Sequence, residues 1–161
     1  MTFTIRAPHP DEAELLADLH LRTWAETYAD HFPPSAWGED ARAQRLRMWT
    51  AICTDPRPDW RTAVAEAGGH PVGIAHSADD RDDPANAPRQ LWLIYLLQSV
   101  QGSGAGQALL DSVLGTEPAS LWVLEDNPRA RAFYARNGFT PDGARQPTGF
   151  DTGGDEIRLV R

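Results

Sequence analysis

The fold is decided by Leu91-Trp-Leu-Ile-Tyr-Leu-Leu-Gln-Ser-Val-Gln-Gly-Ser-Gly-Ala-Gly-Gln-Ala-Leu-Leu110. This stretch begins with seven apolar residues at 91–97, too few to span a bilayer, which predict a strand buried on both faces. A glycine-rich turn follows directly. Beyond Gly106 the apolar residues recur at helical spacing as far as Gly115, so we expect a helix that ends there.

The turn carries three alternate glycines, Gly102, Gly104 and Gly106. Glycine adopts backbone angles closed to other residues and places no side chain between the backbone amides and a ligand. The helix that follows adds its unpaired first-turn N–H donors and the positive end of its dipole. The combination predicts a site for a phosphate or pyrophosphate, and a purely structural turn is the alternative.

Two common phosphate-binding motifs do not fit this turn. A P-loop requires Lys and then Ser or Thr after its last glycine, whereas Gln107 and Ala108 stand here. The dinucleotide fingerprint spaces its glycines by one and then two residues and opens its fold. Here the spacing is one and one, and the turn lies far along the chain.

Two stretches resemble the GNAT superfamily of acetyl-CoA-dependent N-acyltransferases. Gln101-Gly-Ser-Gly-Ala-Gly106 is similar to its Gln/Arg-x-x-Gly-x-Gly/Ala signature. Asn127-Pro-Arg-Ala-Arg-Ala-Phe-Tyr-Ala-Arg-Asn-Gly-Phe139 is similar to the family's Asn-x-x-Ala-x-x-Phe-Tyr-x-x-x-Gly-Phe. The motifs stand in the family's order, and the resemblance covers residues 88–139. Two departures are Ala105, where the family usually has isoleucine, and Gln98, where proline is common.

The resemblance implies a binding mode for acetyl-CoA. In the family the fourth and fifth strands splay apart and the pantetheine arm enters the gap. Carried over to this sequence, the implied cofactor contacts are Leu96, Leu97, Gln101, Gly102, Ser103, Gly104, Ala105, Gly106, Asn127 and Tyr134. Asn127 also precedes Pro128, and this pair alone would start a helix as cap and first residue.

The reaction that the resemblance implies is direct attack of an amine on the acetyl thioester. Tyr134 occupies the family's tyrosine position, and a phenol with a reference pKa of about 10 can give a proton to the departing thiolate. Packing in the core is its alternative role. The backbone N–H of Leu96 is the candidate for polarising the thioester carbonyl. Residues 91–97 hold no carboxylate to serve as a base; the remaining candidates are Glu26, Glu66, His76 and Glu125.

The acceptor site is expected between two N-terminal helices. The first starts at Pro10–Glu14, with Leu15, Leu16, Leu19 and Thr23 on one face, and a second, capped by Ser35, covers roughly 35–53. Around their turn, candidate substrate-binding residues are Trp24, Glu26 and Tyr28, with His31 nearby; ordinary aromatic packing is the alternative. The acceptor stays open between a small amine, a peptide N-terminus, an amino acid and an antibiotic.

Composition limits the class of protein. The 161 residues suit one domain, 1–161, and the excess of 23 acidic over 15 basic residues gives a net charge of -8 that disfavours nucleic acid and membrane surfaces. We expect a cytoplasmic protein, because no secretory signal or membrane span is evident. One cysteine, Cys53, excludes an internal disulfide, and no histidine pair has metal-site spacing, so no metal is expected. The family resemblance admits a homodimer.

The predicted fold class is α/β, with a GNAT-like mixed, mostly antiparallel central sheet, a splayed central parallel strand pair and flanking helices. The remaining strands are expected at 2–6, 60–67, 71–77, 119–124, 139–145 and 156–161, and a last helix is expected from 127 to Gly138. Residues 79–88 predict a solvated loop, and turns at Pro147–Gly149 and Gly153–Gly154 join the last two strands.

The predicted function is transfer of the acetyl group from acetyl-CoA to an amine in a ternary complex. Two other classes of protein use the same features. An acyl-CoA-binding regulatory module would bind the cofactor without releasing thiol, and a nucleotide-binding protein would prefer NAD or ATP to coenzyme A.

Overall fold

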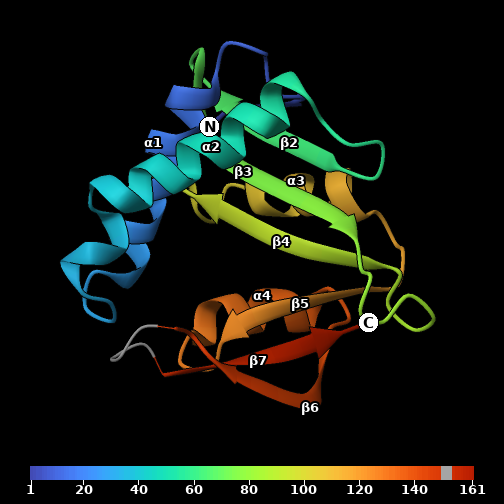
Figure 1. The fold of residues 1–161 in the computed structure, drawn as a ribbon. Coiled ribbons are helices and arrows are strands. Elements are labelled where there is room, and N and C mark those ends of the chain that lie inside the picture. Colours follow the sequence, from blue (N-terminus) through green and yellow to red (C-terminus); the bar gives the residue numbers. More distant parts are fainter. Residues whose placement is uncertain (150–153) are drawn as a thin grey trace.

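The computed structural model describes residues 1–149 and 154–161. These residues form one seven-stranded sheet in the order β1-β2-β3-β4-β5-β7-β6, in which only β4 and β5 run parallel (Figure 1). The strands are β1 (Thr4–Arg6), β2 (Arg61–Ala67), β3 (His70–Asp79), β4 (Arg89–Leu96), β5 (Ala119–Leu124), β6 (Thr140–Pro147) and β7 (Asp155–Val160). The α-helices are α1 (Ala13–Tyr28), α2 (Glu39–Thr54), α3 (Ala105–Leu114) and α4 (Pro128–Arg136). The predicted fold class is confirmed.

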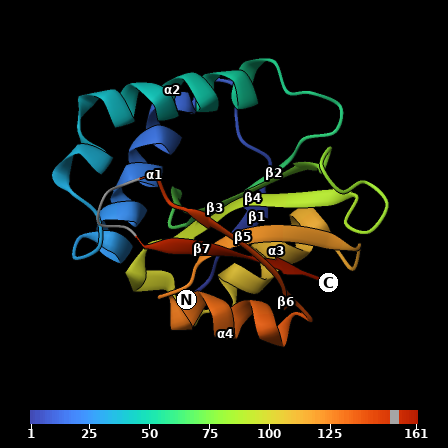
Figure 2. The same cartoon turned by 60° about the horizontal axis from the view of Figure 1, so that its bottom comes forward.

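Helices cover both faces of the sheet. Figure 2 shows α1 and α2 on one face and α3 and α4 on the other. One core cluster joins α3 and α4 to the sheet through residues such as Leu109, Leu110 and Tyr134. A second cluster joins α1 and α2 to the opposite face through Leu16 and Trp49. A side chain on the central strands therefore meets one pair of helices or the other according to its position along the strand.

The parallel pair at the centre of the sheet separates after three residues. Arg89–Leu91 of β4 pair with Ala119–Leu121 of β5, and no pairing follows. Beyond this point β4 continues along β3 as far as Leu96, while β5 continues along β7 as far as Leu124. The strands splay because each remains paired to its outer neighbour.

A bulge in β4 lies at the point of separation. Ser77 of β3 faces Leu91 and His76 faces Leu93, so Trp92 has no partner on β3. Its side chain is 62% exposed. The prediction that residues 91–97 are buried on both faces was therefore wrong at this residue.

The first two helices differ from prediction in detail. Gly38, with an extended backbone, divides the predicted second helix into a short 3₁₀ turn at Pro34–Trp37 and α2, and Ser35 makes no capping hydrogen bond. In α1, Leu15 faces solvent instead of the core. Asn127 does cap α4, because its Oδ1 accepts the N–H of Ala130 at 3.1 Å. The predicted Gly153–Gly154 turn lies partly outside the described residues.

The acidic loop after β3 is tied to the sheet. Asp80 is buried, its Oδ2 accepts the hydroxyl of Ser120 at 2.7 Å, and its Oδ1 accepts the backbone N–H of Asp82 at 2.9 Å. Arg158 of β7 forms ion pairs with Asp80, Asp83 and Asp142. The expectation of a freely solvated loop was wrong, since its carboxylates satisfy buried donors on β5 and β7.

Stability is expected to fall as the pH drops below 6.5. Burial lowers the pKa of His20 to about 3 and that of His76 to about 4, against 6.5 when exposed. In this pH range the unfolded chain binds a proton at each histidine and the folded chain does not. The free energy of unfolding therefore falls by about 2 kcal/mol per histidine between pH 6.5 and 5. Urea unfolding across this range measures the slope. His76→Gln should remove about half of this dependence of the unfolding free energy on pH. An unchanged dependence would contradict the lowered pKa of His76.

Candidate active site

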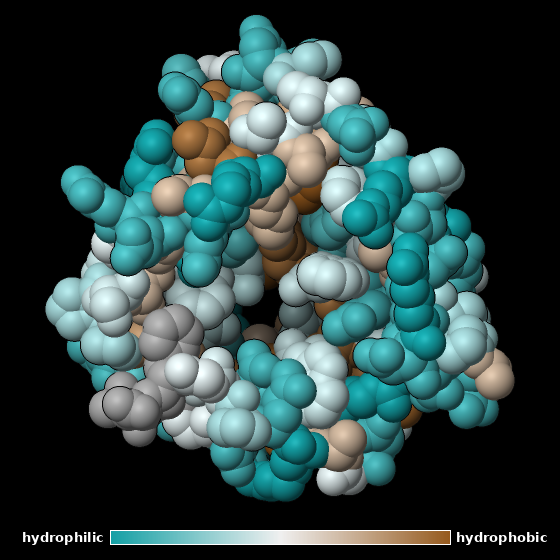
Figure 3. Space-filling model, in the orientation of Figure 1, coloured by the Kyte–Doolittle hydropathy of each residue, from teal (hydrophilic) through white to brown (hydrophobic). Residues whose placement is uncertain are grey.

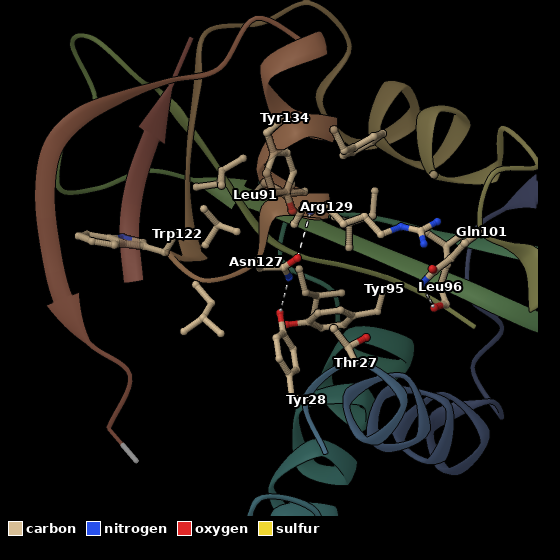
Figure 4. Close-up of a pocket in the computed structure, with 18 of the residues that line it drawn as sticks. Thr27, Tyr28, Leu91, Tyr95, Leu96, Gln101, Trp122, Asn127, Arg129 and Tyr134 are labelled. Carbon is tan, nitrogen blue, oxygen red and sulfur yellow. Dashed lines mark hydrogen bonds between the residues drawn. The ribbon is translucent and has the colours of Figure 1, made fainter. Parts of the chain in front are cut away.

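A cavity of about 470 Å³ lies where β4 and β5 separate. Figure 3 shows a hollow at the centre of this face with hydrophobic side chains inside it. The wall is formed by β4 and β5, by α1, by the glycine turn before α3, and by α4 and β7 (Figure 4). Predicted site residues that line it are Trp24, Tyr28, Leu96, Gln101, Gly102, Gly104, Gly106, Asn127 and Tyr134.

The glycine turn presents unused backbone donors to the cavity. Gly102 and Gly104 adopt φ angles of +82° and +91°, which other residues rarely adopt. Within the described chain, no acceptor binds the N–H groups of Gly102, Gly104, Gly106 and Gln107, and all four residues line the cavity. Four such donors beside the start of α3 make a site for an anion.

The other residues of this turn have structural contacts. The hydroxyl of Ser103 donates to the carbonyl of Val100 at 2.6 Å and accepts the N–H of Ala105 at 3.3 Å, and Ala105 is buried in the core. The N–H of Leu97 donates to Val72. Ser103, Ala105 and Leu97 do not line the cavity. Their contacts instead support the glycine turn and the strand end that do line it.

Gln101 and Leu96 connect the turn to the end of β4. The side-chain amide of Gln101 donates to the carbonyl of Leu96 at 3.5 Å (Figure 4). Both residues line the cavity. This contact holds the turn against the strand at the place where β4 has left β5.

Asn127 connects the two faces of the sheet. Its Oδ1 caps α4, and its Nδ2 donates to the hydroxyl of Tyr28 on α1 at 3.4 Å, as the dashed lines of Figure 4 show. The cap that the sequence predicts is present. The second contact places Tyr28 of the predicted acceptor side directly beside α4.

Tyr134 extends from α4 into the cavity (Figure 4). Its ring packs edge-on against Phe133 and Phe139, with centroids 5.5 and 5.9 Å away, and its side chain is 8% exposed. Burial raises the pKa of its phenol well above the usual value. The group therefore keeps its proton throughout the neutral range, and in the described chain no acceptor holds its hydroxyl.

The acceptor side is lined by aromatic residues of α1. Trp24 and Tyr28 lie in the wall, with ring centroids 5.2 Å apart. Glu26 is not in the wall, because its carboxylate accepts the backbone N–H of Gln98 at 2.8 Å and forms an ion pair with Arg22. His31 lies 3.6 Å from the carboxylate of Asp126.

The four candidate bases lie outside the cavity wall. Each has a partner elsewhere: Glu66 with Arg6, Glu125 with Arg145, His76 with Thr62 and Glu26 with Gln98. None is placed to take a proton from an amine inside the cavity.

Several wall residues escaped the sequence analysis. Trp92 and Trp122 line the cavity from β4 and β5, and Arg129 and Arg136 line it from α4. Both arginines lie within the motif at residues 127–139, so their place in that motif could have predicted them. Glu156 of β7 also lines the wall, and no local pattern marks it.

Neither a membrane helix nor a metal cluster is found in the part of the chain that is described. Each of its helices is too short or too polar to cross a bilayer. No group of three or more His, Cys, Asp or Glu side chains within residues 1–149 and 154–161 is arranged to hold a metal ion.

Comparison with known proteins gives a consistent result. Residues 58–141 match the family model of the acetyltransferase (GNAT) domain. An uncharacterized N-acetyltransferase of Mycobacterium bovis is 38% identical over 135 residues, which are 75% of this chain and 81% of the relative. A protein of Mycobacterium tuberculosis described as a probable N-acetyltransferase is 28% identical over 151 residues, 86% of this chain and 80% of the relative.

Solved structures share the fold. The PaiA N-acetyltransferase of Thermoplasma acidophilum, crystallised in complex with coenzyme A, superimposes with a TM-score of 0.68 at 20% identity, over 100% of this chain and 99% of that one. The family model covers more than half of the chain, and the relative from M. bovis covers three quarters of it. This chain belongs to the GNAT acetyltransferase family and is an acyltransferase.

Proposed function

We propose that this chain transfers the acetyl group of acetyl-CoA to the nitrogen of an amine, by direct attack in a ternary complex. The observation that carries the proposal is the cavity between β4 and β5, which has unused amide donors on one side and Tyr134 in its wall. The acceptor is a small-molecule amine or a peptide N-terminus. The site is built from one domain that includes residues from α1 to β7.

The pyrophosphate of acetyl-CoA binds the unused amides of Gly102, Gly104, Gly106 and Gln107 in this proposal. Gln101 supports the turn, and Ser103 and Ala105 shape it from behind. The pantetheine arm lies in the gap between the strands, along the backbone of Leu96 and beside Asn127, while the N–H of Leu97 is held by Val72 on β3. Arg129 and Arg136 supply positive charge on the same face as α3.

The chemistry requires a neutral amine, a polarised carbonyl and a proton for the thiolate. The amine nitrogen attacks the thioester carbon, and the C–S bond breaks as the tetrahedral intermediate collapses. The backbone N–H of Leu96 stabilises the carbonyl oxygen, and Tyr134 gives its proton to the departing sulfur. Water takes the proton lost by the nitrogen, and Tyr134 regains a proton from water before the next turnover. No carboxylate base is needed if the amine reacts in its neutral form.

A thermal-shift titration tests the cofactor. Acetyl-CoA and coenzyme A should raise the melting temperature, since a ligand at 100 times its dissociation constant stabilises the fold by about 2.7 kcal/mol. NAD and ATP, run side by side, should not. A shift with NAD or ATP alone would contradict the proposal. If acetyl-CoA binds but no amine of a test panel causes release of the coenzyme A thiol, the chain would be an acyl-CoA-binding module without transferase activity.

A further inference from the structure

The cavity has opposite charges on the two faces of the sheet. On the face of α3 and α4 its wall includes Arg129, Arg136 and the unused amides of the glycine turn. On the other face stands Glu156 of β7. In the described chain Glu156 is the one carboxylate in the wall, so the two faces suit ligands of opposite charge.

The position of Glu156 follows from the alternation of β7. Ile157 and Leu159 point into the core beneath α3, so Glu156 points to the face that carries α1. It faces Leu124 on β5 and Gln146 on β6. Glu156 therefore lies on the opposite face from Tyr134, which packs in the α3 core.

The carboxylate of Glu156 has unused capacity to accept hydrogen bonds. Its Oε2 accepts the side-chain amide of Gln146 at 2.9 Å, and no cationic side chain of residues 1–149 or 154–161 forms an ion pair with it. Arg158, two residues further along the same strand and on the same face, already pairs with three aspartates. A carboxylate can accept about four hydrogen bonds, so most of the capacity of Glu156 remains for a ligand.

Two tyrosines of the cavity lie close enough to Glu156 for its charge to affect their pKa. Burial is the main cause of the raised pKa of Tyr28 on α1, and the negative charge of Glu156 adds to it. Burial is also the main cause of the raised pKa of Tyr95 on β4, with smaller contributions from Tyr28 and Glu156. Both phenols stay neutral, so they add no second negative charge beside the carboxylate.

Aromatic rings line the space on this face. Trp24 stacks on Phe32 with centroids 5.5 Å apart, and Tyr28 meets Phe32 edge-on at 5.3 Å. All three rings line the cavity. The guanidinium of Arg45 already lies 5.0 Å over the ring of Trp24. The remaining ring surface buries apolar groups, so it complements the apolar body of an amine whose ammonium ion binds Glu156.

We infer that Glu156 binds the acceptor as its ammonium ion, and that the acceptor is a primary amine with an apolar or aromatic body and no carboxylate beside the nitrogen. The inference rests on the proposed function. A carboxylate on the acceptor would meet Glu156 as a like charge. The bound ammonium loses one proton to water, and its nitrogen then attacks the thioester. Glu156 is thus a residue for recognition, and Tyr134 keeps the role of acid.

Phenethylamine and phenylalanine form a matched pair of probes, because they differ only in the carboxylate. Thiol release from acetyl-CoA should show a kcat/KM at least about 10-fold higher for phenethylamine. Glu156→Gln keeps the contact with Gln146 but removes the charge. This variant should lower kcat/KM for phenethylamine by about 10- to 100-fold, mainly through KM. The ratio of kcat/KM between phenethylamine and phenylalanine should therefore become smaller. The dissociation constant of acetyl-CoA should not change.

The matched control is Asp155→Asn, which removes one negative charge from the same strand at a residue outside the cavity wall. Asp155→Asn should keep the wild-type preference for phenethylamine over phenylalanine. Equal rates with both probes, or an unchanged preference in Glu156→Gln, would overturn the inference while leaving the proposed function intact. Phenethylammonium binding is measured separately, as a thermal shift of the coenzyme A complex that Glu156→Gln should abolish. Failure of every amine to release thiol despite this shift would instead contradict the proposed function.

Discussion

Gly104→Val is expected to lower the affinity for acetyl-CoA and coenzyme A by at least about 100-fold. Gly104 has a φ of +91°, and a Cβ built there would meet no atom within 4 Å. The valine therefore meets no steric clash in the folded chain, but it adds bulk within the turn whose amides at Gly102, Gly106 and Gln107 are unused. A branched side chain at this φ also pushes the backbone toward other angles, which turns the amides away from a common ligand.

Gly69→Val separates loss of binding from loss of stability. Gly69 lies in the turn between β2 and β3, has a φ of +78° and likewise has open space around it. Each variant should lose roughly 1–2 kcal/mol of unfolding free energy, because both place an L residue in the left-handed region. Isothermal titration should show normal coenzyme A binding for Gly69→Val and none for Gly104→Val. Normal binding by Gly104→Val would place the pyrophosphate elsewhere.

The parts of the site that the sequence predicts are those built from local backbone chemistry. Alternate glycines permit positive φ angles that other residues avoid, and Gly102 and Gly104 adopt them, whereas Gly106 does not. Asn127 before Pro128 favours a helix start in any context, and it caps α4. Both features lie in short stretches whose conformation depends on neighbours within a few residues.

The parts that the sequence does not predict depend on partners far along the chain. Trp92 is exposed because β4 bulges against β3 where the parallel pairing ends, and that register is fixed between strands. Asp80 is buried because Ser120 and Arg158 need acceptors there. Glu156 reaches the cavity only because β7 inserts between β5 and β6. No local pattern records these contacts.

Tyr134→Phe is expected to lower kcat by about 100- to 1000-fold, within the range typical of a lost general acid. The variant removes one oxygen and keeps the ring between Phe133 and Phe139, so the melting temperature and the dissociation constant of acetyl-CoA should stay close to those of the wild type. Single-turnover thiol release measures the step itself. Because the effect falls on kcat, it separates a proton donor from a residue that only binds the cofactor.

The pH profile gives a second test of the same role. Burial raises the pKa of Tyr134, so its phenol remains protonated well above neutral pH, and its titration should cause no fall in rate up to about pH 10. The rate of the wild type should instead rise with pH as the free amine becomes neutral. The rise should persist in Tyr134→Phe at a lower rate. An undiminished kcat in Tyr134→Phe would give this tyrosine a packing role and would leave protonation of the thiolate to water or to Tyr28, whose hydroxyl also lies in the cavity wall beside α4.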